Sequence, residues 1–105
     1  MKGNIVRNEE RFVMRYNSVL DLHTHTVASG HAYCSLREMA KAASEKGLEV
    51  LGITEHAPSM PGTCHKFYFN NLKVVPREMY GIQLLLGSEV NILDAQGTVD
   101  LGQHT

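Results

Sequence analysis

The chain has 105 residues, of which 43% are hydrophobic and 20% charged, and its formal net charge is −1. This composition predicts a soluble globular unit of one domain at most and excludes a disordered chain. The near-neutral charge gives no electrostatic basis for binding nucleic acid or an anionic membrane, and every apolar run is far shorter than the ~20 residues of a membrane-spanning helix. We therefore expect neither a nucleic-acid partner nor a membrane partner.

The first residues differ in character from the rest of the chain. Residues 1–17 are polar and show no sustained period, so we expect an N-terminal extension, with a short strand or helix around 11–16, ahead of a domain over 18–105. They contain no apolar core of the signal-peptide kind, which indicates a cytoplasmic protein. In such a reducing compartment Cys34 and Cys64, which form no C-x-x-C pair, are expected to be free thiols.

The next segment predicts a strand, a helix and a second strand. The apolar run 18–22 is typical of a buried strand. Ser35 and Glu38 fit the S-x-x-E capping box of a helix start, and Gly47 is well placed to end that helix. The apolar face of this helix comprises Leu36, Met39, Ala40 and Ala43. Residues 48–54, LEVLGIT, lack polar alternation, as in a covered strand of a parallel sheet. The order indicates a right-handed βαβ unit.

The remaining residues predict one more parallel strand. A loop rich in proline and glycine covers 55–70, and a short helical piece, bent at its proline, follows over 71–80. Residues 81–93 predict the third strand, in which Gly87 suggests a bulge or a close backbone approach. Residues 95–101 predict a turn and a short strand. The fold class is therefore α/β, with about three parallel strands and intervening helices.

Three histidines lie close together after the first strand. His23 and His25 stand at i and i+2, so on an extended chain both side chains project to one side and can chelate one ion. Asp21 is placed to hydrogen-bond one of them. An isolated H-x-H motif is more often a pair of surface histidines, and His31 alone would be read as a solvent-facing loop residue. Their position behind a buried strand favours a metal site for zinc, manganese or iron.

The ends of the second and third strands supply further candidate ligands. His56 follows the second strand, at the edge of a parallel sheet where α/β proteins bind ligands. Glu89 is a lone carboxylate in an apolar strand, which is costly to bury unless it is paired or metal-bound; the alternative is an exposed strand end. The predicted metal ligands are His23, His25, His31, His56 and Glu89.

Other polar residues lack this placement. His65 lies within the long loop and is a candidate to line a pocket, whereas His104 is read as a solvated tail residue. Thiolate ligation by Cys34 or Cys64 stays open beside the expectation of free thiols. The sequence contains no G-x-S-x-G motif, no phosphate-binding glycine loop and no plausible Ser–His–Asp order, so no side-chain nucleophile is assigned. A metal-activated water is the natural nucleophile for histidines with a carboxylate.

The stretches DLHTHTVASGHAYCSLREMAKAASEKGLEVLGITEHAP and LLLGSEVNILDAQGTVDL resemble the PHP (polymerase and histidinol phosphatase) family of metal-dependent phosphoesterases, in its branch of small stand-alone bacterial phosphatases. The likeness covers about residues 18–101. It implies the N-terminal portion of a distorted (β/α)7 TIM-like barrel. It also implies up to three zinc or manganese ions, sometimes iron, at the C-terminal edge of that barrel.

The resemblance assigns roles by position. His23 and His25 would hold a first metal, and Glu89 would bridge the first and second. His31 and His56 would belong to the third. Every one of these five positions occurs in this chain, in the family's order.

Two departures from the family pattern matter. Glu55 stands where the family commonly has Asp. The family's remaining ligands come from sequence well beyond residue 105, so the ligand set is incomplete and the parallel strands keep open edges. We therefore expect a partial PHP domain over 18–105 that needs a missing C-terminal portion or a homo-oligomer. Alone, it is expected to retain metal weakly and to show little or no activity.

The resemblance implies a hydrolase that cleaves a small phosphorylated substrate, a phosphomonoester, by metal-activated water. Histidinol phosphate is one such substrate within the family, and nothing in these residues selects it. Two alternatives stay open. One is a non-catalytic metal-binding or oligomerising module. The other is a PHP domain that serves a DNA polymerase, which the near-neutral charge disfavours.

Overall fold

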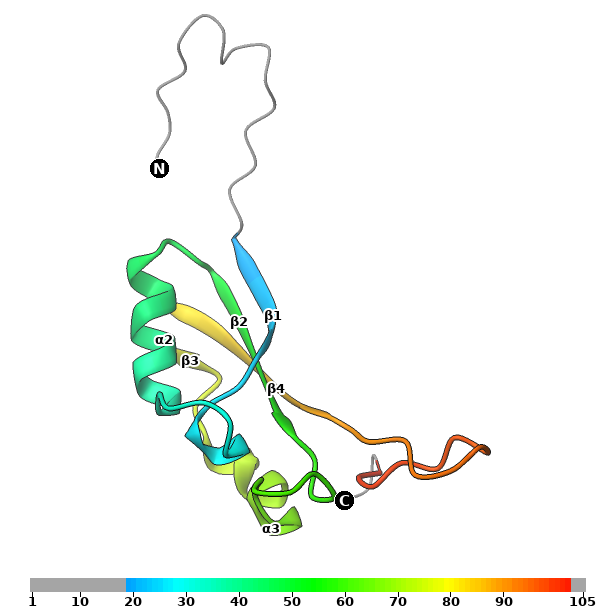
Figure 1. The fold of residues 1–105 in the computed structure, drawn as a ribbon. Helices are drawn as coiled ribbons and strands as arrows, with labels where there is room; N and C mark the ends of the chain where they lie inside the picture. Colours follow the sequence, from blue (N-terminus) through cyan, green and yellow to red (C-terminus); the bar gives the residue numbers. More distant parts are fainter. Residues whose placement is uncertain (1–18, 103–105) are drawn as a thin grey trace, which may run out of the picture.

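The computed structural model describes residues 19–102, which form one four-stranded sheet with helices beside it (Figure 1). The strand order is β1-β2-β4-β3, where β1 is Leu20–Thr24, β2 is Val50–His56, β4 is Ile82–Glu89 and β3 is Glu78–Met79. The pairs β1·β2 and β2·β4 are parallel, and β3 is antiparallel to β4. The predicted α/β class with three parallel strands is confirmed, and the barrel stays a prediction. The expected N-terminal extension, including 11–16, lies outside the described residues.

Helix α2 (Leu36–Glu45) begins and ends where the sequence predicts. At its start the Ser35 N–H donates to Glu38 Oε1 at 2.7 Å, and the Glu38 N–H donates to Ser35 Oγ at 3.2 Å, which completes the capping box. At its end Gly47 has a φ of 85°, and the Leu48 N–H donates to the Ala43 carbonyl at 3.0 Å. This is a Schellman termination, for which glycine is the favoured residue.

The core lies between α2 and the central strands, on the face of the sheet that α2 covers in Figure 1. The predicted apolar face of α2 is confirmed, because two of its alanines are buried and its leucine and methionine pack against the same cluster. The buried cluster comprises Ala40, Ala43, Leu51, Ile53, Ile82 and Leu84. Burial of this apolar surface is what holds the helix to the sheet.

Strand β1 differs from its prediction as a buried strand. It lies at an edge of the sheet and pairs with β2, and the side chains of Leu20 and Leu22 are 48% and 51% exposed. An apolar run predicts that the side chains of a strand are buried, but the described residues pack against only one face of this sheet. The register of β1 also shifts between Asp21 and Thr24, so the bulge lies here. The prediction of a bulge or a close backbone approach at Gly87 is wrong, because that residue pairs regularly with Thr54 and a Cβ there would meet only a side-chain atom.

The segment between β2 and β4 is more ordered than predicted. The loop expected over 55–70 starts later, because β2 continues to His56, and it ends in α3 (Lys66–Asn70). The helix expected over 71–80 is a short 3-10 helix, η2 (Asn71–Val74). None of the described helices has the length and apolar character needed to cross a membrane.

A tight hairpin joins β3 to β4. Its two turn residues, Tyr80 and Gly81, have φ angles of 53° and 80°, which fits the twist that two-residue hairpins require. This hairpin was not predicted from the sequence, because tyrosine rarely adopts a positive φ. Strand β4 ends at Glu89, before the predicted 93, and the strand expected within 95–101 is reduced to a single bridge between Ile92 and Val99.

Asp100 connects the segments that follow strands β2 and β4 by hydrogen bonds. Its carboxylate accepts the Asn91 N–H and side-chain amide, each at 2.8 Å, and the Ser59 N–H at 2.9 Å. Desolvation opposes ionisation, but the hydrogen bonds from Asn91 and Ser59 prevail and lower the pKa of Asp100 well below its usual range. The segment after β4 is thereby fastened to the loop after β2.

The close approach of β1 to β2 predicts an intolerance of side chains at Gly52. A Cβ there would lie 2.9 Å from the Cα and the carbonyl oxygen of Leu22, so β1 would have to move. We expect Gly52→Ala to lower the free energy of unfolding by about 1–3 kcal/mol in urea denaturation. The control is Gly87→Ala, whose Cβ would meet only Thr54 Cγ2 at 3.7 Å and should change stability by no more than about 0.5 kcal/mol. Equal effects would contradict the close approach.

The hydrogen bonds that Asp100 accepts from Asn91 and Ser59 predict a pH-dependent contribution to stability. A carboxyl whose pKa is lower in the folded state stabilises the fold above its unfolded pKa of ~3.9, and this contribution is lost as the pH falls through the folded value. We expect Asp100→Asn to be less stable than wild type near neutral pH, with the difference in free energy of unfolding narrowing only below about pH 4. Urea denaturation at several pH values measures the free energy of unfolding of both proteins. A difference in free energy of unfolding that does not depend on pH would contradict the lowered pKa of Asp100.

Candidate metal centre

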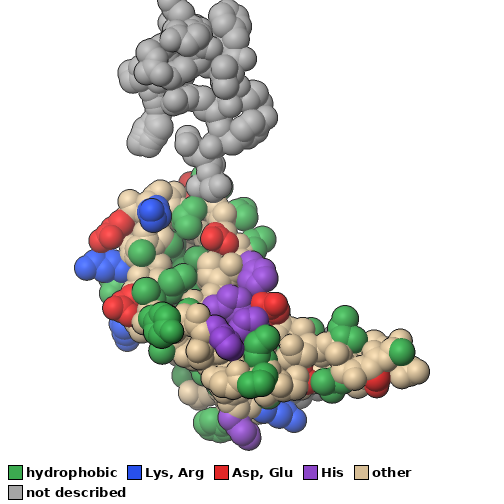
Figure 2. All heavy atoms as spheres, in the orientation of Figure 1, with side chains coloured by type: hydrophobic (Ala, Val, Ile, Leu, Met, Phe, Trp, Pro, Cys, Tyr) green, Lys and Arg blue, Asp and Glu red, His purple; other side chains and the backbone are tan. Residues whose placement is uncertain are grey.

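The predicted ligands come from the carboxyl ends of three parallel strands. His23 lies near the end of β1, and His25 directly follows that strand. His56 and Glu89 are the last residues of β2 and β4, and they are partners in the register between those strands. Parallel pairing therefore places all four at one edge of the sheet, as the sequence predicts. Figure 2 shows histidine side chains gathered on this face of the molecule.

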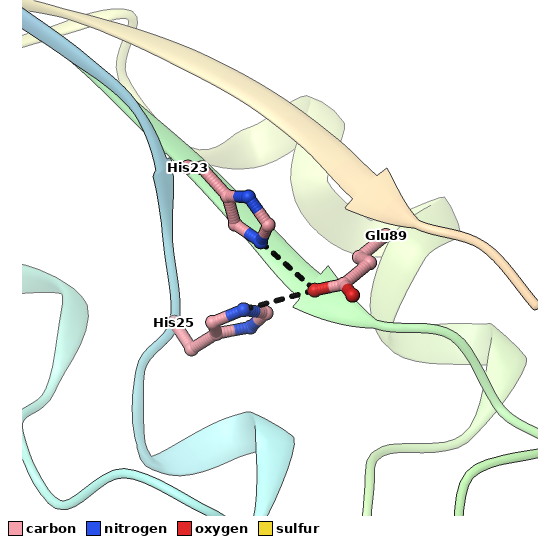
Figure 3. Close-up of side chains that lie close together, drawn as sticks. All are labelled: His23, His25 and Glu89. Atoms are coloured by element: carbon pink, nitrogen blue, oxygen red, sulfur yellow. Dashed lines mark hydrogen bonds and ion pairs between the residues drawn. The ribbon is translucent and has the colours of Figure 1, made fainter.

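Two imidazoles point at one carboxylate oxygen (Figure 3). The Nε2 atoms of His23 and His25 lie 2.9 Å and 3.1 Å from Oε1 of Glu89. One ligand atom from each residue fits within a group whose members are all within 4.8 Å of one another. The His25 side chain is 22% exposed and that of Glu89 is 42% exposed, so the group is open to solvent on one side. Glu89 is thus both paired and partly exposed.

The contacts of Glu89 determine its charge. The hydrogen bond from His23 lowers the pKa of Glu89; desolvation opposes this shift, and positive charge on His56, His23 and His25 adds to it. The carboxylate oxygen and a neutral imidazole nitrogen both carry lone pairs, which repel at hydrogen-bond distance. A proton or a metal ion must lie between them. Each of the two contacts therefore accommodates either an imidazole N–H or a metal ion.

His56 and His31 lie beside this group. The ring of His56 stacks on that of His25, with centroids 4.3 Å apart and planes 11° from parallel. Its Nδ1 is 3.6 Å from Glu89 Oε1, yet this buried atom has no hydrogen-bond partner among the described residues. The His31 ring lies 5.6 Å from that of His56, and its Nε2 donates to the Pro61 carbonyl at 3.3 Å. His31 is therefore adjacent to the cluster, behind His56.

A second carboxylate at the same edge is buried. Glu55 has no exposed surface, and its oxygens accept the Thr26 N–H at 2.9 Å, the Ser29 hydroxyl at 2.7 Å and the Tyr68 hydroxyl at 3.1 Å. The Thr26 hydroxyl also donates to it. Burial and the charge of Glu55 raise the pKa of Tyr68 well above its ordinary value. Buried carboxylates require such partners, and these four donors supply them.

Sequence reasoning missed most of this support. It named Glu55 only as a departure from a family pattern and did not single out Thr26, Ser29 or Tyr68. The signal was present, since Glu55 is a lone carboxylate in an apolar strand and the argument applied to Glu89 applies equally to it. The three hydroxyl residues gave no comparable signal.

Several other polar residues take structural roles. The hydrogen bond predicted from Asp21 to a histidine is made to the backbone N–H of His23, at 3.2 Å, rather than to an imidazole ring. His65 does not line the site; its Nδ1 accepts the Phe67 N–H at 2.9 Å and caps α3. Cys34 and Cys64 are free thiols, as predicted, and burial raises the pKa of the Cys64 thiol. His104 lies outside the described residues.

Comparison with known proteins agrees with the site. Residues 21–103 match the profile of the PHP domain. A probable phosphatase of Clostridium novyi is 60% identical over 88 residues, which cover 84% of this chain and 35% of that protein. A probable phosphatase of Thermoanaerobacter sp. is 52% identical over 83 residues, 79% of this chain and 34% of that protein. A probable phosphatase of Caldanaerobacter subterraneus is 50% identical over 91 residues, 87% of this chain and 36% of that protein. The chain spans roughly a third of the length of these relatives, and it belongs to the PHP domain family.

Proposed function

We propose that this chain supplies the N-terminal share of a metal-dependent phosphatase site that hydrolyses a small phosphomonoester. The observation that carries the proposal is the convergence of His23 Nε2, His25 Nε2 and a Glu89 oxygen within 4.8 Å of one another. Membership of the PHP domain family and relatives that are named probable phosphatases support the same reaction class. The names of these relatives favour the phosphatase over a polymerase-associated domain.

The side chains fit a divalent cation. Two imidazole nitrogens and one carboxylate oxygen suit zinc or manganese, and iron accepts the same donors. Three protein ligands leave further coordination positions open, as catalytic sites require. The buried Nδ1 of His56, which lacks a partner among the described residues, is a further unused donor next to this group. Buried polar atoms rarely remain unpaired, so this atom too indicates a missing ligand.

The residues of the site fall into two groups with different roles in the proposed reaction. A bound divalent cation supplies Lewis-acid chemistry, which activates water and offsets the charge of a phosphate ester. His23, His25 and Glu89 would hold that cation on the open face of the sheet, where a small substrate would have access. His31 and His56 are proposed to serve a further cation, as the family resemblance implies. No side chain is assigned as the nucleophile.

The ligand set of this chain is expected to be incomplete. The chain spans roughly a third of its relatives, and the leucine side chains of β1 are half-exposed on an edge strand. Further ligands and cover for this face would come from additional sequence or from a second copy. We therefore expect the 105-residue chain to retain metal weakly and to turn over slowly. A cytoplasmic location and a domain starting near residue 18 remain predictions from the sequence.

Metal binding by the histidine pair is the direct test. We expect the double variant His23→Ala, His25→Ala to bind Zn²⁺ and Mn²⁺ more than ~100-fold more weakly than wild type in calorimetric titration, because losing an outer-sphere partner alone typically costs ~10–100-fold. His65→Ala is the matched control, since His65 caps α3 and lies outside the group. Any hydrolysis of an aryl phosphate should require the cation and disappear in the double variant. Equal cation binding by wild type and double variant would refute the assignment.

A further inference from the structure

The Ser29 hydroxyl lies between a buried carboxylate and two of the histidines. Ser29 belongs to the 3-10 turn η1 (Val27–Ser29) and is completely buried. Its Oγ donates to Glu55 Oε1 at 2.7 Å, accepts the His56 backbone N–H at 2.9 Å and lies 3.3 Å from His25 Nδ1. The hydroxyl thus connects Glu55 to the ring nitrogen of His25 that is not directed at Glu89.

The number of hydrogens available decides how these contacts are made. A serine hydroxyl has one hydrogen, whereas a carboxylate only accepts. Since Glu55 is both charged and nearer than His25, the Ser29 hydrogen points at Glu55. The oxygen of Ser29 then faces His25 Nδ1 as an acceptor. The contact is favourable only when the ring carries a hydrogen on Nδ1. In the neutral ring Nε2 then has a lone pair that faces Glu89 and needs a cation between the two atoms.

We infer that Ser29 and Glu55 are positioning residues that hold His25 in its Nδ1–H tautomer, with Nε2 free to bind a divalent cation. The inference rests on the proposed function for its consequence, since only a bound cation needs that lone pair. Without a cation, Glu89 Oε1 competes for the ring hydrogen at Nε2, so the preference of Ser29 for the Nδ1–H form is measured by itself once Glu89 is replaced. Metal-binding histidines generally donate their second N–H to an acceptor that fixes the ring, and the loss of that acceptor typically costs about 10–100-fold in metal affinity.

Because of the hydrogen-bond partners of Glu55, a substitution can remove its charge while keeping an acceptor next to Ser29. The Oε1 atom beside Ser29 also accepts the Thr26 N–H at 2.9 Å, and a backbone N–H only donates. In a Glu55→Gln variant the amide oxygen must therefore remain at the Oε1 position. The amide nitrogen then replaces Oε2, where hydroxyls of Thr26 and Tyr68 are able to rotate and accept. Ser29 keeps its orientation in this variant, so His25 keeps its tautomer.

Zn²⁺ titration of the 105-residue chain tests the consequence. We expect Ser29→Ala to bind Zn²⁺ about 10–100-fold more weakly than wild type, and Glu55→Gln to retain wild-type affinity. The matched control is Ser88→Ala, which removes a neighbouring hydroxyl that donates to the Glu55 backbone carbonyl at 3.3 Å and should also leave affinity unchanged. Equal affinity of Ser29→Ala and wild type would overturn the inference and leave the proposed function standing. Failure of wild type to bind Zn²⁺ would overturn the proposed function instead.

The tautomer is measured independently of any cation. In Glu89→Ala protein the competing acceptor at Nε2 is removed from a partly exposed position, so the fold should persist. Nitrogen-15 NMR of labelled histidines, recorded well above the ordinary imidazole pKa of ~6.5, should find the His25 hydrogen on Nδ1. Adding Ser29→Ala should remove this preference, which a purely structural role of Ser29 would not do. A His25 ring with its hydrogen on Nε2 in Glu89→Ala protein overturns the inference, even if Ser29→Ala fails to fold.

Discussion

The site depends on β2 being hydrogen-bonded in parallel to β1 on one side and to β4 on the other. Parallel strands bring their carboxyl ends to one edge, so residues far apart in sequence meet there without any contact between loops. The register pairs His56 with Glu89, and the shift in β1 between Asp21 and Thr24 spans His23, whose ring reaches the same oxygen as that of His25. A one-residue slip of β4 would turn Glu89 to the opposite face.

Alternation along the strands gives two carboxylates at this edge opposite environments. Glu55 points to the face that carries Leu51 and Ile53, where it is buried and held by four hydrogen-bond donors. Glu89 points to the open face, where imidazoles and solvent surround it. The first carboxylate organises the polypeptide behind the histidines, and the second faces the place where a cation would bind. Support and binding are therefore divided between the two faces of one sheet.

Local signals in the sequence predicted those parts of the structure that short-range chemistry determines. The capping box at Ser35, the termination at Gly47 and the apolar strand β2 each follow from residues close in sequence, and all are confirmed. The convergence of His23, His25 and Glu89 also followed, because parallel strand ends must share an edge. The exposure of β1 depends on which face is covered, and the hairpin at Tyr80 depends on an uncommon backbone angle. The hydroxyl contacts of Glu55 are made by residues up to 29 positions away, so no local pattern reveals them.

The central claim is that His23 and His25, at the end of β1, and Glu89, at the end of β4, bind one cation. Anomalous diffraction at the zinc absorption edge, from crystals of the protein grown with Zn²⁺, tests this claim most directly. We expect an anomalous peak within about 2.0–2.2 Å of Nε2 of His23, Nε2 of His25 and a carboxylate oxygen of Glu89. Zinc bound elsewhere in fully loaded crystals, with these three side chains not coordinated, would contradict it.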